Sequence, residues 1–263
     1  MSSSAPVLQI TGLTKHYGGV KALTDISFNV REHEIRAIIG PNGAGKSSML
    51  NCINGVYTPS EGSITFRGQT FDHMDSHQVA TMGIARTFQN LALFKGMSVL
   101  DNIMTGRNLR MKSNLFLQAL RIGPAQAEEE RHRDFVEHII DFLEIQAHRK
   151  TPVGQLPYGL QKRVDLGRAL ALEPEVLLLD EPMAGMNVEE KQDMCRFILD
   201  VNDEFGTTIV LIEHDMEIVF KVAQHIHVLS YGKLLAQGNA EQIRTHPLVI
   251  EAYLGQPQGT DHG

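Results

Sequence analysis

A glycine-rich octapeptide, Gly-Pro-Asn-Gly-Ala-Gly-Lys-Ser, occupies residues 40–47, directly after an apolar run at residues 35–39 that only Arg36 interrupts. This is the spacing of a phosphate-binding loop between a strand and a helix. Glycines permit positive φ and close approach of the backbone, so successive N–H groups can surround phosphate oxygens while the helix N-terminus faces the anion. Lys46 is expected to reach the terminal phosphates, and the Ser47 hydroxyl is expected to ligate Mg²⁺.

The alternative for this octapeptide is an ordinary glycine-rich turn. The complete G-x-x-x-x-G-K-[ST] pattern in its strand-to-helix setting favours the phosphate-binding loop. The sequence therefore predicts a site for a nucleoside triphosphate and Mg²⁺, formed by Gly40, Pro41, Asn42, Gly43, Ala44, Gly45, Lys46, Ser47 and Ser48.

Two adjacent carboxylates, Asp180 and Glu181, follow a second apolar run at residues 176–179. Side chains alternate along a strand, so the two carboxylates are expected to face opposite ways and to do different work. Asp180 can join Mg²⁺ beside Ser47, and Glu181 can face the γ-phosphate to orient or deprotonate water. Alternatively, the pair caps the turn that follows through Pro182.

Two further polar residues follow strand-like segments. His214 comes just after the apolar run at residues 208–212 and could hydrogen-bond the γ-phosphate, although a lone histidine there could also cap a helix. Gln89 follows residues 84–88 and would be an amide ligand that links the metal to the next segment. A single glutamine is a weak signal by itself.

The nearly continuous apolar runs at residues 35–39, 176–179 and 208–212 are typical of parallel strands covered on both faces. Ligands bind at the carboxyl ends of such strands, so the glycine-rich loop, the carboxylate pair and His214 are expected to meet in one place. Shorter runs predict an antiparallel layer beside the loop, and a last strand pair joined at Tyr231-Gly232 before a helical tail. These runs are residues 7–10, 22–30, 63–67, 226–230 and 233–237.

Between residues 89 and 160 the pattern becomes helical, because Phe135, Ile139, Phe142 and Leu143 recur at helical spacing. Residues 128–134 are charged apart from His132 and predict a solvated face. We therefore expect one domain at residues 6–255, with an α/β core at 6–88 and 161–255, an inserted helical arm at 89–160, and flexible tails at 1–5 and 256–263.

Size and composition exclude several classes of protein. The chain has 263 residues, a formal net charge of -7 and no long Lys/Arg block, which argues against a surface that binds nucleic acid. Cys52 and Cys195 are expected to be buried and reduced. The first residues lack a secretory signal, and no apolar stretch is long enough to span a bilayer, so any membrane role is expected to require a partner protein.

Together these segments resemble the ATP-binding subunit of an ABC transporter over nearly the whole chain. Residues 40–47 match Walker A, Gln89 the Q-loop, residues 156–161 the signature, residues 176–181 Walker B and His214 the switch histidine. Tyr17 matches the aromatic residue that stacks on adenine, which suits any base because stacking needs no hydrogen bond. An exposed Tyr near a turn is the alternative. The resemblance implies a P-loop NTPase α/β core with a mostly parallel sheet, an antiparallel β subdomain and an inserted helical subdomain.

Several short segments are most similar to the branched-chain amino-acid type of importer, which urea and some aromatic-acid importers also resemble. These segments are residues 87–91, the Tyr-Gly form of the signature, and residues 184–187, 212–216 and 251–255. Two departures from the wider family stand out. Pro157, Tyr158 and Gly159 replace a Ser-Gly-Gly sequence, which removes the hydroxyl expected on a partner's γ-phosphate, and Asn187 stands where many members carry Asp.

The resemblance implies two cassettes that close head to tail on ATP, each contacting the other's nucleotide near Pro157, Tyr158 and Gly159. The second cassette is an identical or a related chain. The partners implied are integral membrane permeases, at the cytoplasmic face of the cell membrane, and indirectly a periplasmic or extracellular solute-binding protein. Residues 91–99, with Leu93 and Phe94, are expected to dock on the permeases, although they could instead pack within the arm.

The function implied is an energy-coupling ATPase for import of a small polar solute, with Glu181, His214 and Lys46 as its catalytic residues. A soluble ABC-type ATPase that acts on nucleic acid or ribosomes is the alternative from another class. Such proteins usually carry two cassettes or a long coiled-coil insertion, and neither is visible in this sequence.

Overall fold

Two β-sheets form the centre of the protein, whose computed structural model describes residues 5–71, 74–87, 91–111 and 124–254. The first sheet is antiparallel with the strand order β2-β1-β4-β5. The expected antiparallel layer is therefore confirmed, and β1 runs well beyond the predicted residues 7–10. The strands of this sheet are β1 (Leu8–Tyr17), β2 (Val20–Val30), β4 (Glu61–Phe66) and β5 (Gln69–Phe71).

The second sheet has the order β10-β9-β3-β8-β7-β6. All its neighbouring strands pair in parallel except β9 and β10, which form an antiparallel hairpin. The three buried strands expected from the apolar runs are confirmed as β3, β8 and β7, and they are direct neighbours. The strands are β3 (Ile35–Ile39), β6 (Ile84–Arg86), β7 (Val176–Asp180), β8 (Thr208–Ile212), β9 (His225–Ser230) and β10 (Lys233–Gly238).

Strand β3 is buried at every position, including Arg36, which interrupts its apolar run. The Arg36 guanidinium donates to the Glu34 carboxylate at 2.6 Å, so the charge is paired inside the protein. Burial, with the nearby Arg36, lowers the pKa of His227 on the neighbouring strand to about 4, so this imidazole is neutral at physiological pH. A paired arginine beside a neutral histidine explains how a charged residue is tolerated here.

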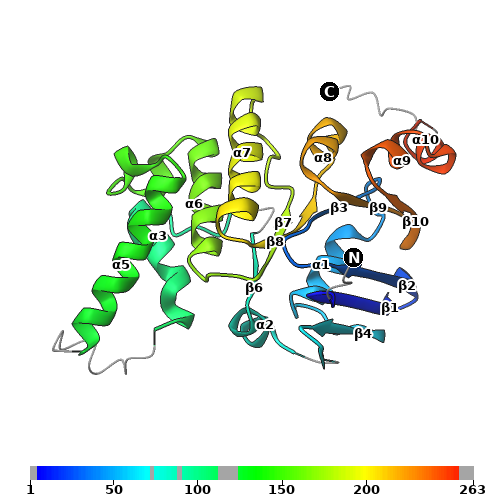
Figure 1. Ribbon diagram of the computed structural model, residues 1–263, viewed down its shortest axis with the longest axis horizontal. Coiled ribbons are helices and arrows are strands. Elements are labelled where there is room, and N and C mark those ends of the chain that lie inside the picture. Colours follow the sequence, from blue (N-terminus) through cyan, green and yellow to red (C-terminus); the bar gives the residue numbers. More distant parts are fainter. Residues whose placement is uncertain (1–4, 72–73, 88–90, 112–123, 255–263) are drawn as a thin grey trace.

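Helices cover the second sheet, and Figure 1 shows α7 and α8 on one side of its strands with α9 and α10 at the C-terminal end. Cys52 and Cys195 lie on helices α1 and α7, and both are free and buried as expected. Burial raises the pKa of the Cys52 thiol to about 11. The helices outside the arm are α1 (Lys46–Ile53), α2 (Ser76–Met82), α7 (Val188–Glu204), α8 (Met216–Val222), α9 (Ala240–Arg244) and α10 (Pro247–Leu254).

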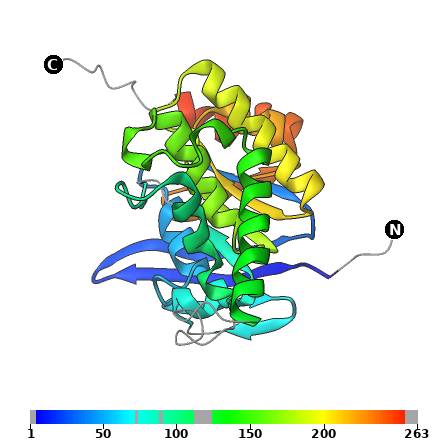
Figure 2. The ribbon, with the colours of Figure 1, turned by 90° about the vertical axis from the view of Figure 1, so that its left-hand side faces the viewer.

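Helices α3, α5 and α6 form a group beside the sheets, which Figures 1 and 2 show from two directions. The helical pattern predicted for residues 89–160 is confirmed for the described part. Along residues 126–134 of α5 only His132 is buried, so the predicted solvated face is confirmed for the charged residues of this run. The elements of this group are α3 (Val99–Thr105), η1 (Gly106–Leu109), α5 (Pro124–Phe142), η2 (Gln146–His148), η3 (Val153–Gln155) and α6 (Tyr158–Leu170).

One hydrophobic cluster connects this helical group with the second sheet. It contains Ile139 and Leu143 from the helical side, and Leu177 and Ile209 from the strands. Phe197 of α7 is fully buried among them, with its ring centroid 6.0 Å from that of Phe142. A second cluster fills the space between the two sheets, so β3, β7 and β8 carry apolar side chains on both faces.

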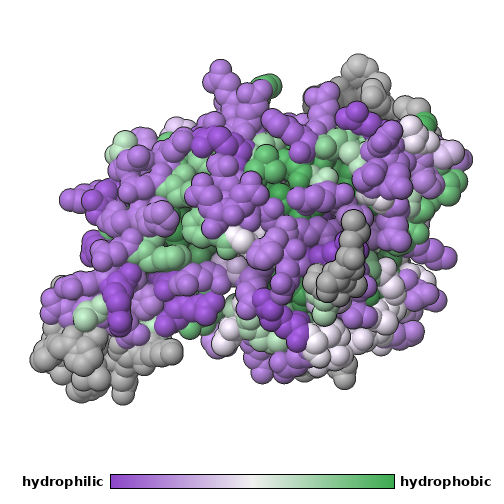
Figure 3. All heavy atoms as spheres, in the orientation of Figure 1, coloured by the Kyte–Doolittle hydropathy of each residue, from purple (hydrophilic) through white to green (hydrophobic). Residues whose placement is uncertain are grey.

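No helix among the residues that the structure describes is long and apolar enough to cross a bilayer. Figure 3 shows polar side chains over most of the face in view, with smaller apolar areas between them.

Phe197→Ala is expected to lower the free energy of unfolding by about 3–5 kcal/mol, because it leaves a cavity where the helical group meets the sheet. Urea unfolding monitored by circular dichroism measures this loss. Val188→Ala on the same helix is the matched control, since Val188 is 71% exposed and should change stability by less than about 0.5 kcal/mol. Equal losses in both variants would contradict the central position of Phe197.

Candidate functional site

The glycine-rich loop lies between β3 and α1, as its sequence predicts. Gly40, Gly43 and Gly45 have φ values of 150°, 79° and 100°, where side-chain-bearing residues are strained. A Cβ on Gly40 would collide with the Leu229 carbonyl, and one on Gly45 would lie 2.6 Å from the Ala22 carbonyl. The loop can adopt this shape only with glycine at these two positions.

The Lys46 side chain hydrogen-bonds the backbone of its own loop. Its ammonium donates to the Gly40 carbonyl at 2.7 Å and to the Pro41 carbonyl at 3.1 Å. Burial lowers the pKa of Lys46, while the charges of Glu181 and Asp180 act in the opposite direction. The buried lysine is therefore bonded to backbone carbonyls of its own loop. Of the remaining loop residues, Ala44 is buried, Pro41 and Ser48 are half-buried, and Asn42 and Ser47 are exposed.

Asp180 is the last residue of β7 and is buried. Its Oδ2 accepts a hydrogen bond from Arg86 at 2.6 Å, and Arg86 also donates to Asn51 of α1 at 2.6 Å. The other carboxylate oxygen, Oδ1, is buried and has no hydrogen-bond partner within the described part of the chain. A buried carboxylate oxygen without a donor is the kind of hard ligand that suits Mg²⁺, so Asp180 fits the metal predicted beside Ser47.

Glu181 follows with a φ of 49°, a left-handed conformation that is unusual for glutamate. Its N–H donates to the Ile212 carbonyl at the end of β8 at 3.0 Å. Its Oε1 lies 2.5 Å from His214 Nε2, so the two residues are in direct contact. The strand ends of β7 and β8 thus bring together the glutamate and the histidine that the sequence analysis selected.

Sequence reasoning missed two residues that support this arrangement. Glu213 is buried, and its carboxylate accepts hydrogen bonds from the N–H groups of Met183 at 3.0 Å and His214 at 3.1 Å. Burial raises the pKa of Glu213. Arg86, at the end of β6, is the second. In the sequence, only its place at the end of a predicted strand could have indicated a role for Arg86. Its hydrogen-bond partners become apparent only in the folded chain.

Tyr17 stands at the end of β1 with 39% of its surface exposed. Its ring meets that of Tyr57 edge to face, with the centroids 5.4 Å apart, and the Lys15 ammonium lies 5.3 Å from the Tyr17 centroid. Burial raises the pKa of Tyr17, and the nearby Ser48 side chain of α1 acts in the opposite direction. The ring is therefore held beside the glycine-rich loop with part of its surface open to solvent.

The predicted signature segment forms the start of α6. Pro157 is the N-cap with a φ of -52°, and no side chain caps this helix end. Tyr158 is exposed, and its ring lies against Gly185 in the loop after β7. A Cβ on Gly185 would come 3.1 Å from this ring. Gly159 is buried against Glu190, whose carboxylate would collide with a Cβ there.

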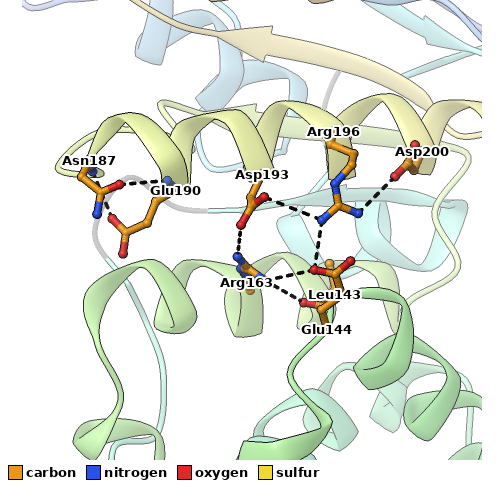
Figure 4. A network of polar contacts seen from close by, with 8 residues as sticks. All are labelled: Leu143, Glu144, Arg163, Asn187, Glu190, Asp193, Arg196 and Asp200. Carbon is orange, nitrogen blue, oxygen red and sulfur yellow. Dashed lines mark hydrogen bonds and ion pairs between the residues drawn. The ribbon is translucent and has the colours of Figure 1, made fainter.

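Asn187 is the N-cap of α7, and it forms a reciprocal pair of hydrogen bonds with Glu190. Asn187 Oδ1 accepts from the Glu190 N–H at 2.9 Å, and the Glu190 carboxylate accepts from the Asn187 N–H at 3.0 Å (Figure 4). Asn and Asp cap helices about equally well, so this departure from the wider family preserves the local structure.

A network of ion pairs beside this cap joins α6 with α7 and with the end of α5 (Figure 4). Arg163 of α6 donates to Asp193 of α7 at 2.5 Å. Arg196 of α7 donates to Glu144, which follows α5, at 3.0 Å. The beginning of α6 is therefore held to the helix that follows the candidate catalytic carboxylates.

The segment expected to contact permeases is described from residue 91 onward, and Gln89 lies outside the described residues. Leu93 packs against the main hydrophobic cluster, whereas Phe94 is 55% exposed. Asn102 is fully buried and donates to the carbonyls of Phe94, Met97 and Ser98 at 3.0–3.2 Å. The loop is thus fixed from within while Phe94 is presented to solvent.

A parallel sheet with a phosphate-binding loop, two carboxylates and a histidine at adjacent strand ends defines a P-loop nucleotide-binding protein. A family model described as ABC transporter matches residues 23–184, and one described as branched-chain amino acid ATP-binding cassette transporter matches residues 233–257. The chain belongs to the ABC transporter family and is an ATP hydrolase of this type. The resemblance to its branched-chain amino-acid branch is confirmed.

Curated relatives and solved structures agree with this family. The high-affinity branched-chain amino acid transport ATP-binding proteins LivG of Salmonella typhimurium and BraF of Pseudomonas aeruginosa are each 37% identical to the chain, over 96% of it and 99% of their own length. The chain also resembles crystal structures of ABC transporter ATP-binding cassettes. One is nucleotide-free, with a TM-score of 0.83 and 29% identity, and one is in an ADP conformation, with a TM-score of 0.84 and 28% identity. Both alignments cover 96% of this chain and all of the other.

Asn187→Ala is expected to lower the free energy of unfolding by about 1 kcal/mol, because the first turn of α7 loses its cap. Asn187→Asp keeps an acceptor in the same place and is the matched control, with an expected change below about 0.5 kcal/mol. Urea unfolding of the three proteins measures both values. An aspartate variant as unstable as the alanine variant would contradict the capping role.

Proposed function

We propose that this protein is the ATP-hydrolysing subunit of an importer for branched-chain amino acids, bound to permeases at the cytoplasmic face of the cell membrane. The observation that carries the site is the convergence of Lys46, Glu181 and His214 at the ends of neighbouring strands. The solute is supported by the names of the relatives LivG and BraF and by the match at residues 233–257.

We propose distinct roles for the residues around ATP. Tyr17 stacks on the adenine, the backbone of residues 40–45 and Ser48 surround the phosphates, and Lys46 exchanges its loop carbonyls for phosphate oxygens. Mg²⁺, when bound, neutralises phosphate charge, and Ser47, Asp180 and Gln89 are its proposed ligands. Glu181 orients the attacking water, and His214, which contacts Glu181 at 2.5 Å, holds this carboxylate and responds to the γ-phosphate.

The second half of the site is proposed to come from another cassette in a head-to-tail dimer. Pro157 leaves the first turn of α6 without a side-chain cap, so its N–H groups remain suited to a partner's γ-phosphate. Tyr158 and Gly159 would lie at this contact. Each cassette is proposed to have two parts, which move as one unit when the dimer closes. These parts are the helical arm at residues 89–160 and the α/β core at 6–88 and 161–255.

Glu181→Gln is expected to reduce ATP turnover at least about 100-fold, because the amide cannot accept the proton of the attacking water. ATP affinity should be retained, since the loop and Lys46 are unchanged. Steady-state phosphate release and equilibrium binding of ATP with Mg²⁺ measure the two quantities. Glu189→Gln, at an exposed position in the first turn of α7, is the matched control and should hydrolyse at the parent rate.

Turnover by Glu181→Gln at the parent rate would remove Glu181 from its proposed role. Lys46→Ala tests the loop separately, because losing a charge-assisted contact should weaken ATP binding about tenfold or more. Unchanged ATP binding by that variant would contradict the phosphate-binding assignment.

Phe94→Asp is expected to abolish assembly with the permeases while the isolated subunit still hydrolyses ATP, because a charge replaces an exposed apolar side chain that is not among the proposed nucleotide contacts. Reconstitution with the membrane partners, followed by ATPase assays with solute-loaded receptor, measures this loss. Val56→Asp is the control, since Val56 is also exposed, at 45%, and lies in another segment.

The same reconstituted system tests the solute. Stimulation by receptors loaded with leucine, isoleucine or valine is expected, and stimulation by urea or aromatic acids alone would favour the related importers. A protein that never associates with membranes in the presence of integral partners would instead indicate a soluble ABC ATPase.

A further inference from the structure

Arg86, at the end of β6, is hydrogen-bonded to two elements that carry proposed magnesium ligands. Its Nη2 donates to Asp180 Oδ2 at the end of β7 at 2.6 Å. Its Nη1 donates to Asn51 Oδ1 on α1, also at 2.6 Å. The Arg86 side chain is 6% exposed and that of Asp180 is 3% exposed, so the contact is shielded from solvent. A single planar group therefore links α1 to β7, and we term this contact the Arg86 bridge.

The pairing of β6 with β7 explains why these side chains meet. Arg86 is the register partner of Leu178 in this parallel pair, and Asp180 follows Leu178 by two positions. Side chains two positions apart on a strand share a face of the sheet, so Arg86 and Asp180 point to the same side. Leu178 belongs to one apolar cluster with Met49 and Leu50 of α1. The Arg86 guanidinium is thus placed between α1 and the end of β7.

The α1 end of the Arg86 bridge lies one helical turn from Ser47, which is itself a proposed magnesium ligand. Ser47 and Asn51 are four positions apart on α1, so their side chains lie on the same face of the helix. The hydrogen bond to Asn51 therefore restrains this face of α1 relative to Asp180. It follows that the protein itself restrains the separation of Ser47 and Asp180.

The Arg86 bridge also distinguishes the two carboxylate oxygens of Asp180. Oδ2 accepts from Arg86, whereas Oδ1 is buried without a hydrogen-bond partner in the described part of the chain. Two effects then compete. The positive charge of Arg86 reduces the attraction of Asp180 for Mg²⁺, while the hydrogen bond holds the carboxylate in one orientation. Groups that orient metal ligands usually raise metal affinity about 10- to 100-fold, so orientation is expected to dominate.

We propose that Arg86 is a positioning residue for magnesium. It holds Asp180 with Oδ1 available to the metal, and it keeps Ser47 on α1 at a fixed distance from that oxygen. This inference rests on the proposed nucleotide site. It assigns a task to a buried arginine that is not among the proposed ligands of nucleotide or metal.

Arg86→Met is the first variant, because it keeps an unbranched side chain and removes both hydrogen bonds. Binding of a nonhydrolysable ATP analogue at a series of Mg²⁺ concentrations yields two quantities, the Kd of the analogue without metal and the Kd of Mg²⁺ for the occupied site. We expect the Kd of Mg²⁺ to rise about tenfold or more, while the Kd of the analogue without metal stays within about twofold of the parent. The melting temperature should fall, because Asp180 loses a buried partner.

Asn51→Ala is the second variant, and it carries the test if Arg86→Met does not fold. It keeps the buried ion pair between Arg86 and Asp180 and releases only α1 from the Arg86 bridge. Loss of this hydrogen bond should raise the Kd of Mg²⁺ about threefold or more. The Kd of the analogue without metal should again stay close to that of the parent.

Arg107→Met is the matched control, because it also removes a buried ion pair. The Arg107 side chain is 7% exposed, pairs with Glu173 and donates to the Ala171 carbonyl at 2.7 Å. Neither partner is a proposed ligand of nucleotide or metal. The melting temperature of this variant should fall, whereas its Kd of Mg²⁺ should equal that of the parent.

An unchanged or lower Kd of Mg²⁺ in Arg86→Met would overturn the inference. An equal rise in Arg107→Met would assign the effect to stability alone and would overturn it as well. An unchanged value in Asn51→Ala would overturn the role of the α1 contact, and with it the whole inference if Arg86→Met does not fold. If the parent protein binds no nucleotide, the proposed function itself fails, which is a separate result.

Discussion

The parallel pairing of β3, β8 and β7 is the constraint on which the site depends. Ile38 pairs with Ile212, and Ile212 pairs with Asp180, so the three strands end at nearly the same level. Whatever follows each strand must then lie at one edge of the sheet. Apolar clusters on both faces fix this register, because a shift would move buried side chains out of their contacts. Packing far from the edge thus determines which polar groups meet there.

The strands of this sheet could be predicted from sequence because each is a short, nearly continuous apolar run. Strand β1 could be predicted only in part. Register shifts follow Ile10 and Leu13, and Gly12 has a φ of 59°, so the alternation of exposed and buried residues breaks within the strand. The helical arm was predictable in kind from its periodicity. Its contact with the core through Phe197 depends on tertiary packing that no local pattern encodes.

The candidate site, like the fold, could be predicted only in part from the sequence. The loop, the carboxylate pair and His214 were found because residue type and spacing carry their chemistry directly. Arg86 and Glu213 support that chemistry through partners that lie far away in sequence, so their roles follow only from the fold. The left-handed backbone of Glu181 was also unpredictable, since glutamate has no local preference for it.

Most candidate groups at this edge have partners within the protein. Lys46 bonds to carbonyls of its own loop, Asp180 to Arg86, and Glu181 to His214. Binding of a triphosphate therefore exchanges existing hydrogen bonds for new ones, and each exchange contributes much less than an isolated bond would. Affinity then depends on how closely the loop already has its bound shape, because the free energy needed to reshape it is subtracted from the total binding free energy. For this reason the contacts that fix the loop, such as that of the Leu229 carbonyl with Gly40, contribute to affinity together with the groups that touch the phosphates.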